Sequence, residues 1–212
     1  MKRTAGSSML FDGVFVSSYA CTGGITEGEG PLGGRFDEIF PEDMAGEKTW
    51  ESAESRILHE AVKLCISKSG RSASDYDCIF CGDLLNQCIA SNFGLESFDI
   101  PFLGLYGACS TMASALLCAS VFTESGAVGR CVAAASSHFA SSERQFRTPL
   151  LYGGQRAPTA QRTVTGAGAV TLERSGCIRI TAATIGAELD MGITDPNNMG
   201  AAMAPVSVKL TP

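Results

Sequence analysis

Three side chains that could perform chemistry, Asp83, Cys109 and His138, each lie just beyond an apolar run of the chain. An acid, a thiol and an imidazole at one site would suit nucleophilic catalysis, in which a base removes the proton of the thiol. The alternative is that Cys109 is a small buried apolar residue, as many free cysteines are. The elements that position these residues must decide between the two interpretations.

The apolar runs before these residues predict strands. Residues 77–81 (DCIFC), 101–106 (PFLGLY) and 131–136 (CVAAAS) have no regular polar alternation, which is typical of strands covered on both faces of a parallel sheet.

The segments around these strands predict helices. Thr49 can cap a helix over residues 50–68, which has one apolar face, and residues 84–93 and 110–124 have helical composition. Apolar residues occupy nearly all sides of the segment 110–124, so we expect a buried core helix there.

The order strand, helix, strand, helix, strand predicts an α/β fold with a parallel sheet. Right-handed crossovers place the carboxyl ends of such strands at one edge, where open α/β sheets bind ligands. We therefore expect Asp83, Cys109 and His138 to converge. Cys109 also follows a sharp turn at Gly107 and Ala108 and opens a helix, a position typical of nucleophilic cysteines.

The flanking segments are less regular. Residues 9–16 suggest a first strand or hairpin, and residues 21–36 form a glycine-rich segment that lacks the features of a phosphate-binding loop, so we expect it to make turns. Residues 163–172 and 177–186 are rich in strand-forming residues and predict an antiparallel hairpin.

An arginine-rich segment follows His138. It holds four arginines against the single acid Glu143, which suits either the binding of an anion or an ordinary loop or subunit contact; the arginines are Arg144, Arg147, Arg156 and Arg162.

Composition excludes several classes of protein. The chain of 212 residues is 45% hydrophobic with a net charge of −6, which argues against a nucleic-acid-binding protein. It has no uninterrupted apolar stretch of the roughly 18 to 20 residues that a membrane span needs.

Nine cysteines within apolar runs indicate reduced thiols and a cytoplasmic location. Cys78 and Cys81 would lie on opposite faces of a strand and cannot bind one zinc ion, so we expect no metal and no cofactor.

Several motifs are similar to those of a known superfamily. The run GACST before an apolar helix, SSH after the next strand and TGAGAV in a later strand resemble the thiolase superfamily, which includes the ketoacyl synthases. A closer resemblance is to the stage V sporulation protein AD family of spore-forming Firmicutes. It rests on motifs from about Gly30 to Pro205: GPLGGRFD, GDLLNQ, PFLGLYGACST, ASSH, SSERQFRTPLLYGGQ, TVTGAGAV and GITDPNNMGAAMAP.

The resemblance implies a thiolase-like fold of two βαβαβαββ halves, usually assembled as a dimer. On this basis residues 1–175 are expected to form the N-terminal half and residues 176–212 the start of a truncated second half. The core helix would then lack its partner, so we expect self-association.

The resemblance also implies a function. Family members serve the uptake of dipicolinic acid, with its calcium, into the forespore, and are thought to bind the acid without transforming it. The expected partners are dipicolinic acid, other stage V sporulation A proteins and a second copy of the chain, at the forespore or spore inner membrane, where association with the membrane would occur through partner proteins. The expected ligand-binding residues are Asp83, Asn86, Gln87, Cys109, His138 and Arg144.

Two alternatives stay open. One is an acyltransferase or condensing enzyme in which Cys109 is the nucleophile and His138 the base, although the catalytic partners that such enzymes take from the second half are not found in the sequence. The other is a structural subunit whose pocket is vestigial.

Overall fold

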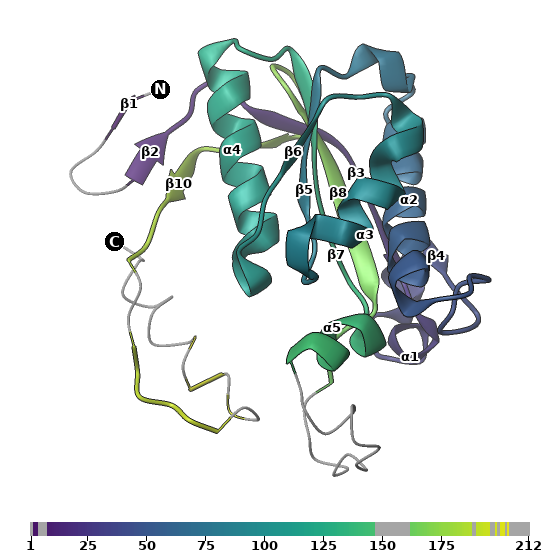
Figure 1. Ribbon diagram of the computed structural model, residues 1–212. Helices are drawn as coiled ribbons and strands as arrows, with labels where there is room; N and C mark the ends of the chain where they lie inside the picture. Colours follow the sequence, from purple (N-terminus) through teal and green to yellow (C-terminus); the bar gives the residue numbers. More distant parts are fainter. Residues whose placement is uncertain are drawn as a thin grey trace.

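The computed structural model describes residues 2–3, 8–146, 162–187, 190–195, 198, 200–201 and 203. A seven-stranded sheet lies between helices, with α2 and α4 on opposite faces (Figure 1). Its strands follow the order β4-β3-β8-β7-β5-β6, and β9 pairs with β3 outside this path. The fold is therefore mixed α/β, as the sequence predicts.

The larger sheet contains β3 (Phe15–Gly23), β4 (Glu38–Ile39), β5 (Cys78–Gly82), β6 (Phe102–Gly104), β7 (Arg130–Ser137), β8 (Gly166–Glu173) and β9 (Ile178–Arg179). A smaller sheet contains β1 (Lys2–Arg3), β2 (Ser8–Leu10) and β10 (Ala182–Thr184). The α-helices are α1 (Ile25–Gly28), α2 (Trp50–Lys68), α3 (Ile89–Leu95), α4 (Thr111–Ser125) and α5 (Phe139–Phe146).

The arrangement of three strands confirms the predicted parallel unit. Strand β5 pairs in parallel with β6 on one side and with β7 on the other. Because all three run in one direction, their carboxyl ends lie at the same edge of the sheet, and Asp83, Cys109 and His138 follow these ends.

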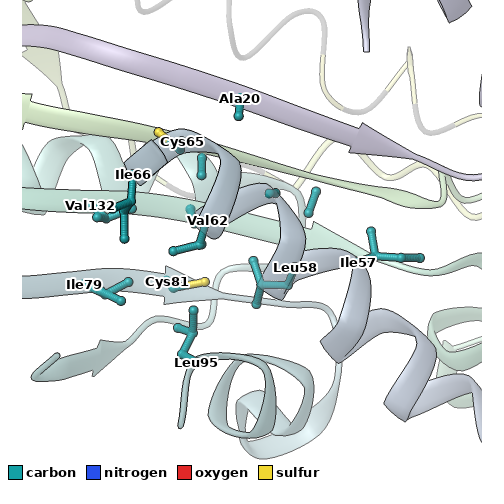
Figure 2. Packing of buried hydrophobic residues seen from close by; sticks show 14 of the residues in the cluster. Ala20, Ile57, Leu58, Val62, Cys65, Ile66, Ile79, Cys81, Leu95 and Val132 are labelled. Carbon is teal, nitrogen blue, oxygen red and sulfur yellow. The ribbon is translucent and has the colours of Figure 1, made fainter. Parts of the chain in front are cut away.

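Helix α2 has the predicted bounds. The Thr49 side chain accepts a hydrogen bond from the Ser52 amide at 3.1 Å, which satisfies one of the free N–H groups of the first turn. The apolar face of α2 packs on the sheet, where Ile57, Leu58 and Val62 meet Ile79 and other strand residues (Figure 2). This contact forms the larger of the two cores.

Helix α4 packs on the opposite face of the sheet. Thr111, Ala115, Ala119 and Thr123, four residues apart, form its buried stripe, whereas Phe122 is exposed. The prediction of a helix buried on all sides is therefore wrong for this chain, which covers only one side of α4.

Strand β6 is also more exposed than predicted. It spans three residues at the edge of the sheet, and Leu103 is 43% exposed. As an edge strand, β6 has a neighbour on one side only and leaves backbone groups unpaired along the other. The exposure of Leu103 shows that its face of the strand is not fully covered either.

The predicted hairpin is wrong. Strand β8 pairs antiparallel with β3 and with β7 along its whole length, and so fills the centre of the sheet. Strand β9 pairs with the start of β3, and β10 pairs with β2. Each strand thus finds partners far away in the sequence, whereas hairpin reasoning considers only the nearest neighbour.

Two segment boundaries also differ from the prediction. Strand β3 runs from residue 15 to residue 23, so the start of the glycine-rich segment belongs to a strand. Helix α3 begins at Ile89 instead of residue 84, because Gln87 and Cys88 have positive φ angles of 63° and 52° that interrupt the helix.

Candidate functional site

A cleft of about 990 Å³ opens at the edge where β5 and β7 end. Its lining residues come from the end of β7, the start of β8, the start of α4, helix α5 and the segment before β8, and they include Cys109, Met112, Ser136, Ser142, Glu143 and Arg162. The parallel strands and the antiparallel β8 therefore bring together residues from widely separated parts of the chain.

Cys109 is exposed in this cleft. It lies in a 3₁₀ turn, Ala108–Ser110, that leads directly into α4, as the sequence predicts. The Ser110 hydroxyl donates to the Gly107 carbonyl at 2.7 Å, and the Gly107 amide donates to the Thr111 hydroxyl at 3.2 Å. These local hydrogen bonds hold the turn that presents the thiol.

A glycine at the end of β5 lets the preceding segment come close. A Cβ atom at Gly82 would lie 1.8 Å from the Leu105 carbonyl oxygen. Since no side chain fits there, the chain that leads to Cys109 passes directly over the end of β5.

His138 is buried and does not line the cleft. Its Nε2 donates to the Asp43 carbonyl at 2.8 Å, and its Nδ1 accepts from the Ala140 amide at 3.2 Å. The ring also packs against Trp50 and Phe139, which contact each other as well. Burial lowers the pKa of His138, although the Asp43 carbonyl opposes this shift. Both nitrogens of a neutral ring are thus engaged away from Cys109.

Asp83 is also buried and does not line the cleft. Its carboxylate accepts from the Leu85 amide at 2.8 Å, the Ser91 amide at 2.7 Å and the Ser91 hydroxyl at 2.6 Å. These bonds fix the start of α3 against the end of β5.

The remaining expected ligand-binding residues lie outside the cleft lining. Asn86 and Gln87 are exposed in the turn before α3. Arg144 forms an ion pair with Glu51 of α2. Of the six residues that the resemblance suggested, the structure places Cys109 in the cleft lining.

Of the two arginines of this segment that the structure describes, Arg144 and Arg162, it is Arg162 that lines the cleft. Its guanidinium lies 4.1 Å from the centre of the Phe139 ring and donates to the Thr26 hydroxyl at 3.0 Å. Its distance to Asp43 Oδ1 is 3.9 Å. Arg147 and Arg156 fall outside the described residues.

Glu54 is a functional candidate that sequence reasoning missed. It is fully buried on α2, and its two carboxylate oxygens accept from the Ser136 hydroxyl at 3.1 Å and the Ser141 hydroxyl at 2.7 Å. Burial, together with the charge of Asp83, raises the pKa of Glu54 to about 7. The signal in the sequence was its position three residues before Ile57, on the apolar face of the helix.

The structure shows how the Cys78 and Cys81 thiols are oriented and whether the described residues could bind a metal ion or span a membrane. Cys81 lies in the core on the α2 side, whereas Cys78 packs against the core on the α4 side, so the two thiols point to opposite faces as predicted. Within the described ranges, no group of three His, Cys, Asp or Glu residues could hold a metal ion. The helices of these ranges are too short or too polar to cross a membrane.

Comparison with known proteins identifies the family. The profile of "Stage V sporulation protein AD (SpoVAD)" matches residues 5–211. The chain belongs to the stage V sporulation protein AD family. A family member from Bacillus subtilis, named stage V sporulation protein AD, is 43% identical over 209 residues. This match covers 98% of the chain and 62% of the Bacillus protein, so the present family member spans about three fifths of that relative's length.

Solved structures identify the fold of this family member as thiolase-like. The 3-oxoacyl-[acyl-carrier-protein] synthase III of Aquifex aeolicus has a TM-score of 0.52 at 17% identity, over 77% of the chain and 54% of the synthase. OleA from Xanthomonas campestris also has a TM-score of 0.52, at 13% identity, over 78% of the chain and 57% of OleA. The resemblance inferred from the sequence is therefore confirmed for both family and fold.

Proposed function

We propose that the cleft beside Cys109 binds dipicolinic acid during spore formation and does not transform it. The observation that carries this proposal is the separation of the thiol from the imidazole. Cys109 faces the cleft, whereas His138 is buried with both ring nitrogens engaged elsewhere. A thiol needs a base within hydrogen-bonding reach to act as an efficient nucleophile. The chain's other histidine, His59, contacts the Gly94 carbonyl of α3 and does not line the cleft.

The cleft also has a group suited to an anion. Arg162 lies at the lining with its guanidinium over the Phe139 ring, and a guanidinium pairs with a carboxylate through two hydrogen bonds. The Cys109 thiol and the serine side chains of the lining are small, so they leave room for a compact ligand.

The wider setting belongs to the same proposal. The ligand enters as the free acid or as its calcium chelate, and other stage V sporulation A proteins act with this chain at the forespore or spore inner membrane. The functional unit is a homodimer. Membership of the stage V sporulation protein AD family supports these statements. They concern the whole protein, of which this chain spans about three fifths in the Bacillus relative.

Titration calorimetry tests the binding. We expect heat from dipicolinate and a much weaker response from benzoate, which has one carboxylate instead of two. Arg162→Gln should weaken dipicolinate binding about tenfold or more, the typical cost of losing a charge-assisted pair. Arg174→Gln is the matched control, because Arg174 donates to the Glu124 carbonyl away from the cleft. Equal affinity for dipicolinate and benzoate would argue against the proposal.

A second candidate function is acyl transfer through Cys109, which its exposure in the cleft favours. Incubation with an acyl-CoA, followed by mass spectrometry of peptides, would show an acyl group on Cys109 if the thiol reacts. Cys177 is also exposed and serves as the internal control for non-specific acylation. A modification of Cys109 no greater than that of Cys177 would exclude this function for the chain.

A further inference from the structure

Glu54 lies directly behind the cleft wall. The Ser136 hydroxyl donates to its Oε1, and Ser136 is itself a lining residue at the end of β7. The Ser141 hydroxyl donates to its Oε2, and the next residue of α5, Ser142, lines the cleft. The buried carboxyl group therefore links two segments that line the cleft, the end of β7 and helix α5.

The hydrogen-bond partners of Glu54 allow its carboxyl group to be protonated. A hydroxyl group both donates and accepts, so either serine can accept from a protonated carboxyl. If Ser141 accepts in this way, its own hydrogen has a second acceptor in place, the His138 carbonyl at 3.2 Å. Asp83 differs, because two of its three donors are backbone amides, which cannot accept in return. Glu54 can thus gain a proton and keep both hydrogen bonds.

The charges around Glu54 oppose its ionised form. Asp83, beyond the end of β5, is the charged group whose field acts on Glu54, and the neighbouring groups from β7 and α5 are the neutral Ser136 and Ser141. Of the charged residues of α5, Glu143 lines the cleft and accepts from the Thr163 amide, whereas Arg144 pairs with Glu51. The Thr22 hydroxyl of β3 bonds to the Ile57 carbonyl.

We propose that Glu54 is the proton-binding residue of this cleft, and that it takes up a proton when an anionic ligand enters. An anion at the lining adds a second negative charge close to the carboxylate, which favours the neutral acid. The coupling is reciprocal, so protonation of Glu54 must also favour the anion. This inference rests on the proposed function, because it assumes that the ligand is an anion such as dipicolinate.

The linkage has a defined sign. Burial raises the pKa of Glu54 to about 7, so the neutral form prevails below that pH and the carboxylate above it. If the anion binds only the neutral form, the apparent affinity falls about tenfold between roughly pH 6 and pH 8.

Calorimetry with dipicolinate near pH 7, in two buffers of different ionisation enthalpy, counts the protons taken up on binding. We expect net uptake by the natural chain and by Glu60→Gln, a matched control on the same helix whose carboxylate pairs with Arg56 and Lys63. Glu54→Gln should bind without uptake, and its affinity should no longer change between the two pH values. Equal proton uptake by Glu54→Gln and the natural chain would overturn the inference.

A second measurement does not require a ligand. Infrared difference spectroscopy of the free chain should show the carbonyl band of a protonated carboxyl growing as the pH falls through about 7, and this band should be missing from Glu54→Gln. Ser141→Ala is the second variant, and it should move the midpoint to higher pH, because the Ser141 hydroxyl stabilises the carboxylate.

The outcomes separate the two proposals. If dipicolinate binds none of these proteins, the proposed function fails, and the infrared titration alone decides the role of Glu54. An identical band in the natural chain and Glu54→Gln, or a midpoint that Ser141→Ala does not move, would overturn the inference whatever the calorimetry shows.

Discussion

Cys109 and His138 follow two strands that pair with opposite sides of β5, yet only Cys109 lines the cleft. The strand ends bring the two residues to one edge of the sheet, and the side chains then turn in different directions. His138 points to the α2 side, where Trp50 and the Asp43 carbonyl surround it.

The first prediction is that His138 stabilises the fold and does not activate Cys109. His138→Ala should lower the free energy of unfolding by about 2 to 4 kcal/mol, because it leaves a cavity beside Trp50 and removes a buried hydrogen bond. The rate of Cys109 alkylation by iodoacetamide should change less than about twofold under native conditions, since the imidazole does not reach the thiol. Urea unfolding and peptide mass spectrometry measure the two quantities, and a large fall in the alkylation rate would show that His138 activates Cys109.

The second prediction concerns stability and pH. The pKa of Glu54 is about 7 in the folded chain, above the 4.5 of an unperturbed glutamate, so the folded state holds this proton more tightly than the unfolded state. The contribution of Glu54 to stability therefore falls as the pH rises from about 4.5 to about 7, by up to roughly 3 kcal/mol. Glu54→Gln should remove this slope, as denaturant unfolding at several pH values can show. A slope that persists in full in Glu54→Gln would assign it to other groups.

The third prediction tests the close approach beside Cys109. Gly82→Ala should destabilise the chain by about 2 to 3 kcal/mol, because the new methyl group overlaps the Leu105 carbonyl and must displace the segment before the cysteine. Gly168→Ala in β8 is the control, since a Cβ atom there meets nothing within 4 Å. Thermal unfolding compares the variants, and similar losses at both positions would mean that the approach at Gly82 is not tight.

The fourth prediction concerns self-association of the isolated chain. The exposed side of α4 and the edge strand β6 leave apolar side chains in solvent, and a free strand edge can pair with another chain. Leu103→Lys on β6 should reduce the self-association that we expect in sedimentation experiments. Leu32→Lys is the control at a leucine that is 65% exposed and lies before a 3₁₀ turn distant in sequence from β6. A monodisperse monomer for the unaltered chain would contradict the prediction.

Local signals in the sequence predicted the elements that depend on local interactions. Helix α2 begins and ends where the Thr49 cap and the apolar periodicity place it, and Cys109 lies at the start of α4 as predicted. The position of β8 between β3 and β7 could not be predicted in this way, because a run of strand-forming residues does not specify which distant strands it pairs with.

The directions in which the side chains of the site point also depend on residues that are distant in the sequence. Asp83 turns to Ser91, and His138 turns to the carbonyl of Asp43, 95 positions earlier in the chain. Strand ends do not indicate Glu54, because this acid lies on helix α2 and reaches the end of β7 through the Ser136 hydroxyl. An acid on an otherwise apolar helix face is the pattern that could have identified it.

The central position of β8 also has a consequence for synthesis on the ribosome. Strand β3 is made near the start of the chain, but its long antiparallel neighbour, residues 166–173, emerges only after the whole parallel unit has been translated. Pairing over such a sequence separation is slow, and until it occurs one side of both β3 and β7 is open to other chains. We therefore expect the nascent chain to depend on chaperones until β8 inserts and closes the sheet.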